Sequence, residues 1–135
     1  MTMQVSRDHR AARNQASIDL ADSGAGPSVI ELYDAQGGNL IAVRTLGKPC
    51  GVINTEGRIV LQPASANDMV QLTGKPSFAV WRSGTGASIA ADAVTDQNGS
   101  GPFKVMGTSL GEDGLPTGML YQGGVVVLTS PMVLG

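Results

Sequence analysis

The pattern of apolar and polar positions predicts one helix near the start of the chain. Residues 6–22 read SRDHRAARNQASIDLAD, with Ser6 as a suitable N-cap, and two glycines and a proline in residues 22–27 end the segment. Its apolar stripe at i, i+4 spacing is formed by Val5, Ala12, Ala16 and Leu20. Because this stripe is mostly alanine, it buries little area. The helix is therefore expected to be a minor lid on the sheet or an arm that docks on a neighbour.

After Pro27 the pattern changes to short apolar or alternating runs that are separated by Gly, Asn, Asp and Pro. The connectors are rich in Gly and Asn, which accept the positive φ of hairpin turns. This pattern is typical of an antiparallel sandwich or barrel, and we predict a mainly β chain: an antiparallel, jelly-roll-like β-sandwich with one short N-terminal helix. We expect about nine strands, near residues 28–34, 39–46, 58–63, 68–74, 77–83, 87–94, 102–107, 117–122 and 124–130.

The predicted organisation is an N-terminal helical arm, residues 1–26, followed by a β-sandwich domain, residues 27–135. A chain of 135 residues is near the commonest domain size, so one core is expected. Its last fifteen residues, YQGGVVVLTSPMVLG, carry no charge. Within them we predict a central strand at residues 125–129, covered on both faces. The segment after Pro131 is still apolar, and we expect Met132, Val133 and Leu134 to contact a neighbouring subunit.

The composition of the chain favours burial of part of its surface against another molecule. Charged residues are 15% of the chain, below the roughly 25% of an average globular protein. Part of the surface must therefore be neutral, which suits contact with a partner. The formal net charge of -2 argues against direct nucleic-acid binding, which needs clustered Lys and Arg. The polar start predicts a chain without a signal peptide that stays in the cytoplasm, and no apolar run reaches the 18 or so residues of a membrane span.

The chain has one cysteine, Cys50, and one histidine, His9. An internal disulfide and a two-cysteine metal site are therefore excluded, and a Ser-His-Asp arrangement is possible only around His9. His9 lies between Arg7 and Arg10 with no nucleophile in view, so we expect it to be structural or exposed. Cys50 has no histidine or second thiol nearby in sequence, and we expect a buried or partly buried thiol. We predict no catalytic residues, no metal site and no cofactor.

Three further patterns have ordinary structural explanations. DQNGSG, residues 96–101, resembles half of a calcium loop, but the twelfth position is Gly107 where a chelating Glu is needed, so a hairpin turn is expected. GTGAS, residues 84–88, lies between two strands and is expected to be a turn rather than a phosphate loop. The carboxylates are expected to be solvated charges at turns and strand ends, namely Glu31, Asp34, Glu56, Glu112 and Asp113.

Arg7, Arg10 and Arg13 form a cationic patch on one side of the predicted helix. Nearby aspartates balance it too closely for a nucleic-acid arm. It is either an ordinary solvated helix face or a docking surface for an acidic partner.

The order of these features resembles a family of small structural proteins of tailed bacteriophages. The stretches that carry the resemblance are ARNQASIDLADSGAG, SVIELYDAQGGNLIAVRTL, SFAVWRSGTGASIAADAV and YQGGVVVLTSPMVL, which span about residues 11–134. Two segments have no counterpart in the family pattern, namely KPCGV and ASANDMVQLTGKP. The resemblance implies a jelly-roll-like sandwich that acts as a cement or decoration protein on the outside of the head lattice.

From the residues and this resemblance we expect a non-enzymatic virion protein that binds the major capsid protein and stabilises contacts between capsid subunits. It would be made in the host cytoplasm, located on the capsid surface, and a homo-oligomer, either a dimer or a trimer. One alternative is a structural protein of the tail, neck or fibre-attachment site. Another is a carbohydrate-binding jelly-roll module, in which Trp81 would be a stacking platform for sugar.

Overall fold

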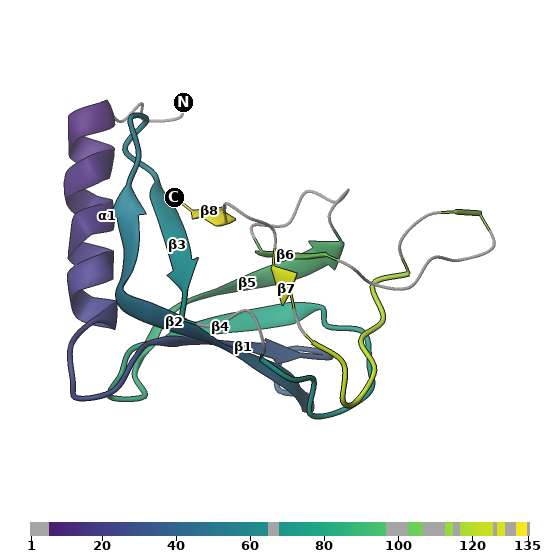
Figure 1. The fold of residues 1–135 in the computed structure, drawn as a ribbon. Coiled ribbons are helices and arrows are strands. Elements are labelled where there is room, and N and C mark those ends of the chain that lie inside the picture. Colours follow the sequence, from purple (N-terminus) through teal and green to yellow (C-terminus); the bar gives the residue numbers. More distant parts are fainter. Residues whose placement is uncertain are drawn as a thin grey trace.

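One helix and eight strands make up the described part of the chain in a computed structural model (Figure 1). The structure describes residues 6–64, 68–96, 103–106, 113–114, 117–125, 127–128 and 132–134. The elements are α1 (Arg7–Ala21), β1 (Val29–Tyr33), β2 (Leu40–Ile53), β3 (Ile59–Pro63), β4 (Phe78–Arg82), β5 (Ser88–Asp96), β6 (Phe103–Met106), β7 (Val127–Leu128) and β8 (Met132–Leu134). The prediction of a mainly β protein with one N-terminal helix is confirmed.

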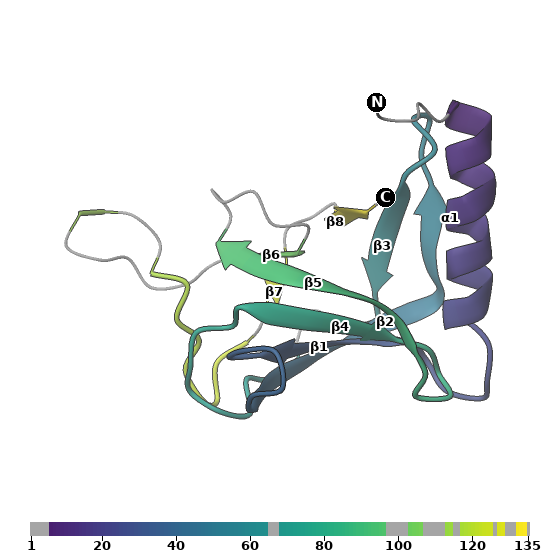
Figure 2. The same cartoon turned by 180° about the vertical axis from the view of Figure 1, so that it is seen from behind.

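The strands form one sheet in the order β7-β6-β5-β4-β1-β2-β3-β8. From β5 to β3 the five central strands are antiparallel, and together they curl into a half-barrel (Figures 1 and 2). β6 joins β5 in parallel, whereas β8 joins the outer edge of β3 in the antiparallel direction. The finer expectation of a jelly-roll-like sandwich, with two sheets packed face to face, is not confirmed by this arrangement.

β2 is the long strand on which the sheet turns. Its first part, Leu40 to Thr45, pairs with β1, and its last part, Gly51 to Ile53, pairs with β3. The register with β3 shifts between Leu46 and Gly51, a segment that includes the cis Lys48-Pro49 peptide bond. The sequence predicted a strand that ended at residue 46, because Gly and Pro in the next four positions are turn signals. In the structure the strand continues through them.

A single hydrophobic core lies inside the curled sheet. Alternation along the central strands directs one set of side chains inward, as with Ile30 and Leu32 of β1, both fully buried. The only tryptophan, Trp81 of β4, is 2% exposed and belongs to this core, so it is not the accessible stacking platform that the carbohydrate-binding alternative would need. The largest fully buried side chains are Trp81, Phe103, Ile30, Leu32, Ile41, Leu46, Val105, Cys50 and Ser28.

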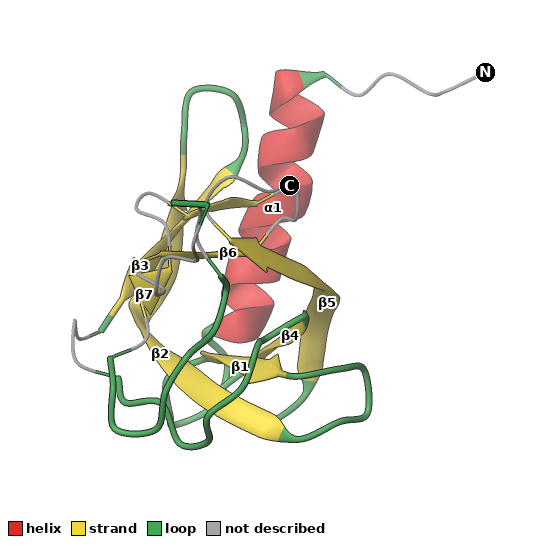
Figure 3. Ribbon diagram, turned by 90° about the vertical axis from the view of Figure 1, so that its right-hand side faces the viewer, coloured by secondary structure: helices red, strands yellow, loops and turns green. Residues whose placement is uncertain are grey.

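α1 packs on the sheet of its own chain, alongside β2 and β3 (Figure 3). Its buried residues are Asn14, Ile18 and Ala21, and the last two belong to the same core as the sheet. The predicted apolar stripe is wrong, since Ala12 and Ala16 are exposed and Leu20 is 55% exposed, while Val5 lies outside the described residues. Simple apolarity selected the wrong face because the buried face contains a polar residue, Asn14, whose amide has a partner on the sheet.

The C-terminal end of α1 is fastened to the bend of β2. Asp22, the C-cap, accepts the backbone N–H of Cys50, with 3.0 Å from that nitrogen to Oδ1. Lys48 Nζ donates to the Gly24 carbonyl at 2.7 Å, and Gly84 N–H donates to the Ala21 carbonyl at 3.2 Å. The helix end, the β2 bend and the β4–β5 turn are thus linked by three long-range hydrogen bonds.

Five of the predicted strands are found within a few residues of the expected positions, a sixth, residues 39–46, continues as β2 to Ile53, and three predictions need correction. Residues 68–74 and 117–122 form only isolated bridges, at Met69, Val70, Gly74 and Leu120. The predicted central strand at residues 125–129 is instead the edge strand β7, and Val125 is 47% exposed. Val126 and Thr129 lie outside the described residues. The prediction that both faces of this segment are covered is therefore wrong at Val125.

Candidate functional site

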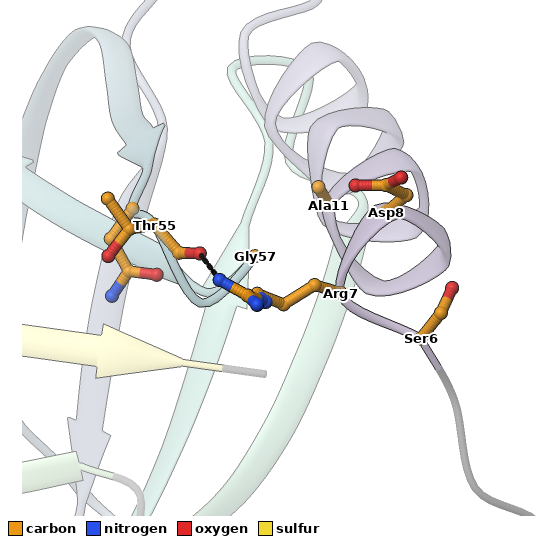
Figure 4. Close-up of a pocket in the computed structure, with 7 residues that line it drawn as sticks. Ser6, Arg7, Asp8, Ala11, Thr55 and Gly57 are labelled. Atoms are coloured by element: carbon orange, nitrogen blue, oxygen red, sulfur yellow. Dashed lines mark hydrogen bonds between the residues drawn. The ribbon is translucent and has the colours of Figure 1, made fainter.

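A polar cleft of about 420 Å³ lies between the first turn of α1 and the β2–β3 turn (Figure 4). Ser6 caps the helix by accepting the His9 backbone N–H at 3.1 Å. Across the cleft, Arg7 Nη1 donates to the Thr55 carbonyl at 3.4 Å. The lining residues are Ser6, Arg7, Asp8, Ala11, Asn54, Thr55 and Gly57.

The β2–β3 turn is held in place by the helix that faces it. Arg10 Nη1 donates to the Glu56 carbonyl at 2.9 Å, and the buried amide of Asn14 donates to the Gly57 carbonyl at 2.8 Å. Gly57 has a φ of +80°, which favours glycine, and a Cβ there would lie 2.6 Å from the Arg7 carbonyl oxygen. The cleft is thus the outer side of a tight contact between the turn and the helix.

These contacts bear on the predicted cationic patch. Arg7 and Arg10 both donate to backbone carbonyls of the β2–β3 turn, whereas Arg13 is exposed on α1. Two of the three guanidinium groups therefore fasten the helix to its own sheet. An additional role of the three arginines in contact with a partner stays a prediction.

His9 and Cys50 have the environments that the sequence predicted for them. His9 is exposed, and Cys50 is fully buried, as expected. Burial, followed by the negative charge of Asp22, raises the pKa of Cys50 to about 12, so the thiol is neutral at physiological pH. Within the described ranges, no three His, Cys, Asp or Glu side chains are placed to hold a metal ion. In the same part of the chain, no helix combines the length and apolar character needed to cross a membrane.

The structure describes only some of the residues of the glycine motifs and some of the carboxylates. The predicted turn at residues 84–88 is confirmed, since Gly84 to Gly86 connect β4 to β5. Of DQNGSG, only Asp96 is described, as the last residue of β5, and residues 97–101 lie outside the described part, as does Glu112. Asp34 closes the β1–β2 hairpin by accepting the Asn39 backbone N–H at 2.8 Å.

Glu31 departs from the expectation of a solvated charge. On β1 it forms an ion pair with Arg82 of β4 and accepts the Tyr33 hydroxyl at 3.1 Å. Its side chain is 20% exposed. β1 and β4 are neighbours in the sheet although β2 and β3 lie between them in the sequence, so the local sequence pattern did not show this pairing.

Two segments, residues 68–74 and 117–125, run side by side and antiparallel, and we call them the apolar ribbon. Backbone hydrogen bonds join them, including Val70 N–H to the Gly124 carbonyl at 2.7 Å and Leu120 N–H to the Gly74 carbonyl at 2.8 Å. Val70 and Leu120 are buried in the core. Met119 is partly buried, and four large apolar side chains of the ribbon are exposed, namely Met69 (59%), Leu72 (43%), Tyr121 (54%) and Val125 (47%).

The apolar ribbon is almost free of charge. Its only charged residue is Asp68, which pairs with the almost fully buried Arg44 at 3.1 Å and also accepts the Thr45 backbone N–H at 2.9 Å. Several large apolar side chains exposed on one segment are a signal for contact with another molecule. The sequence placed these segments in the sandwich and missed their exposure, because alternation shows which residues share a face but not whether that face is covered.

The apolar C-terminal segment pairs with its own chain. In β8, Met132, Val133 and Leu134 are the register partners of Leu61, Val60 and Ile59 of β3. The backbone of this segment is therefore an edge strand of the sheet. Contact of its residues with a neighbouring subunit stays a prediction.

Comparisons with protein-family models, with curated proteins and with solved structures found no match to this chain. The function must therefore be argued from the residues and their arrangement.

Proposed function

We propose that this chain is a non-enzymatic virion structural protein, a cement or decoration protein that binds the outside of a bacteriophage head and stabilises contacts between major capsid proteins. The observation that carries the proposal is the apolar ribbon, with four large apolar side chains 43–59% exposed and no unpaired charge. The resemblance of the sequence to small phage structural proteins points to the same function.

The size of the ribbon indicates the kind of contact that it makes. Complete burial of a large apolar side chain contributes about 1.5–3 kcal/mol, and each of the four is about half exposed, so together they would contribute roughly 3–6 kcal/mol. Free association of two proteins costs about 4–15 kcal/mol in lost translational and rotational freedom. The ribbon alone is thus too small for a strong complex in solution. It suits a site on a lattice, where additional contacts with adjoining capsid proteins complete the binding.

The finer architecture and the oligomeric state belong to this proposal. A jelly-roll-like arrangement would be completed if a second layer covered the open face of the curled sheet. We propose that the protein assembles as a dimer or trimer on the capsid surface, where Met132, Val133 and Leu134 and the arginines Arg7, Arg10 and Arg13 contribute contacts.

Binding to purified expanded heads tests the proposal. The wild-type protein should co-sediment with heads at saturable stoichiometry and raise the temperature at which they disrupt. The double variant Leu72→Ser/Tyr121→Ser should bind about 10- to 30-fold more weakly, because each substitution removes roughly 1 kcal/mol of apolar burial. The matched control is Leu20→Ser, which removes a leucine that is 55% exposed on α1, outside the ribbon, and should bind as the wild type does.

Three results would contradict the proposal or the contact on which it rests. Heads that show neither bound protein nor a thermal shift at saturating concentration would exclude a cement role. A copy number of about six to a few dozen per virion, instead of hundreds, would place the protein in the neck or tail. Equal binding by the ribbon variant and the wild type would show that the ribbon is not the contact.

A further inference from the structure

The open face of the sheet carries a second, smaller pocket, which we call the β1–β4 pocket. Ile30, Leu32 and Trp81 point into the core, so the alternate residues of β1 and β4 project from the opposite face. There a pocket of about 230 Å³ is lined by Tyr33, Gly37, Gly38, Phe78, Val80 and Arg82. This volume lies below the roughly 300–1,000 Å³ of pockets for drug-sized molecules, so the pocket suits a single small ring.

Two aromatic side chains form one side of the β1–β4 pocket. Tyr33 and Phe78 are register partners on adjacent antiparallel strands, so their side chains lie next to each other on the same face. Both are partly exposed. Gly37, in the β1–β2 hairpin, has a φ of +76° and nothing within 4 Å of an added Cβ, so no side chain closes this side.

A polar pair lies beside the aromatic side chains. Glu31 Oε1 accepts both the Tyr33 hydroxyl and Arg82 Nε, while Arg82 Nη1 donates to the Gly86 carbonyl at 3.3 Å. Hydrogen bonds to Glu31 and then Tyr33 raise the pKa of Arg82, which keeps the guanidinium charged. Arg82 lines the pocket, and its ion pair with Glu31 leaves the pair without net charge.

We propose that the β1–β4 pocket binds one neutral pyranose ring. An ionic ligand would meet a like charge as well as an opposite one, whereas a neutral polyol meets no repulsion. A sugar hydroxyl can both donate and accept, so one ring hydroxyl accepts a hydrogen bond from the Arg82 guanidinium that lines the pocket. The apolar C–H face of the ring packs against Tyr33 and Phe78, as apolar and aromatic walls with few polar groups are typical of small-ligand sites.

This inference is independent of head binding, which we assign to the apolar ribbon. A sugar site would give the particle a weak, repeated contact with glycans, since many copies on one surface multiply a weak affinity.

Nuclear magnetic resonance titration with four neutral probes tests the inference: the methyl pyranosides of glucose, galactose, mannose and N-acetylglucosamine. At least one should give saturable shifts at the amides of Tyr33, Gly37 and Phe78, with a Kd on the order of 1–10 mM. Phe78→Leu, which keeps an apolar side chain, should weaken binding about 3- to 10-fold. Arg82→Gln should weaken it at least about 10-fold, since it removes a charged donor.

The controls separate this site from other surfaces. Tyr121→Ala removes an exposed aromatic ring of the apolar ribbon and should leave sugar binding unchanged. Phe78→Leu should bind phage heads as the wild type does, so a failure of one proposal does not decide the other. The inference is overturned if none of the four probes gives saturable shifts, if the shifts map to residues outside the β1–β4 pocket, or if folded Phe78→Leu and Arg82→Gln bind with unchanged affinity.

Discussion

Replacement of Gly57 by alanine would test how tightly the β2–β3 turn and α1 are joined. Gly57 has a φ of +80°, and a Cβ would lie 2.6 Å from the Arg7 carbonyl oxygen and 3.1 Å from the Ala11 backbone nitrogen. Both atoms belong to the helix backbone, which cannot rotate away as a side chain can. The substitution therefore adds a steric clash to the backbone strain.

The two effects differ in magnitude and can be separated. Alanine at positive φ costs roughly 1–2 kcal/mol. Overpacking of a close contact costs typically 1–3 kcal/mol more, so Gly57→Ala should lower the free energy of unfolding by about 2–5 kcal/mol. Gly86→Ala is the matched control, because Gly86 has a φ of +91° but nothing within 4 Å of an added Cβ. It should show only the strain.

Urea unfolding monitored by circular dichroism gives both free energies, and amide hydrogen exchange locates the damage. Gly57→Ala should speed exchange in α1, where Asn14 anchors the helix to the Gly57 carbonyl. Gly86→Ala should leave α1 exchange unchanged. The reasoning is refuted if the two variants lose the same free energy of unfolding, or if Gly57→Ala is destabilised without faster exchange in the helix.

Two other predictions follow from buried groups. Folding raises the pKa of Cys50 from its ordinary value of 9.0 to about 12, so the thiol of the unfolded chain ionises first as the pH rises. The contribution of this thiol to stability is therefore complete below pH 9 and is lost as the pH rises to about 12. Cys50→Ala should flatten the fall in the free energy of unfolding in urea between these pH values, and identical pH profiles of the variant and the wild type would contradict this cause. Asp68→Asn leaves the guanidinium of Arg44, 7% exposed, without a countercharge and should cost about 3 kcal/mol in the same assay. Glu56→Gln, which breaks a 3.7 Å pair with Arg58 whose side chain is 42% exposed, should cost under about 1 kcal/mol, and similar losses in the two variants would be inconsistent with the burial argument.

The sequence predicted the local structure well where the hydrophobic period matched burial. Burial along β1 alternates clearly, and the predicted positions of β1 and β4 are correct to within about a residue. α1 was predicted at the right place but with the wrong buried face. The reason is Asn14, whose hydrogen bond to the Gly57 carbonyl spans 43 residues and leaves no trace in a local pattern.

The candidate sites depend on long-range pairing that the sequence pattern does not contain. The polar cleft needs Arg7 to reach Thr55, and the β1–β4 pocket needs β4 to pair with the distant strand β1 as well as with β5, its neighbour in sequence. The apolar ribbon shows a different limit. Residues 68–74 have the composition of a strand, yet only isolated bridges form, so side chains such as Met69 and Leu72 remain outside the core.

The position of β8 has a consequence for synthesis of the protein on the ribosome. β3 pairs with β2 as soon as the hairpin has been made, but its other edge is covered only when Met132–Leu134 arrive, after residues 64–131 have been translated. During that interval a nascent chain presents an open strand edge to other nascent chains on the same messenger RNA. Such edges are templates for aggregation. The short length of β3 and the proline at its end, Pro63, limit this hazard while the chain is incomplete.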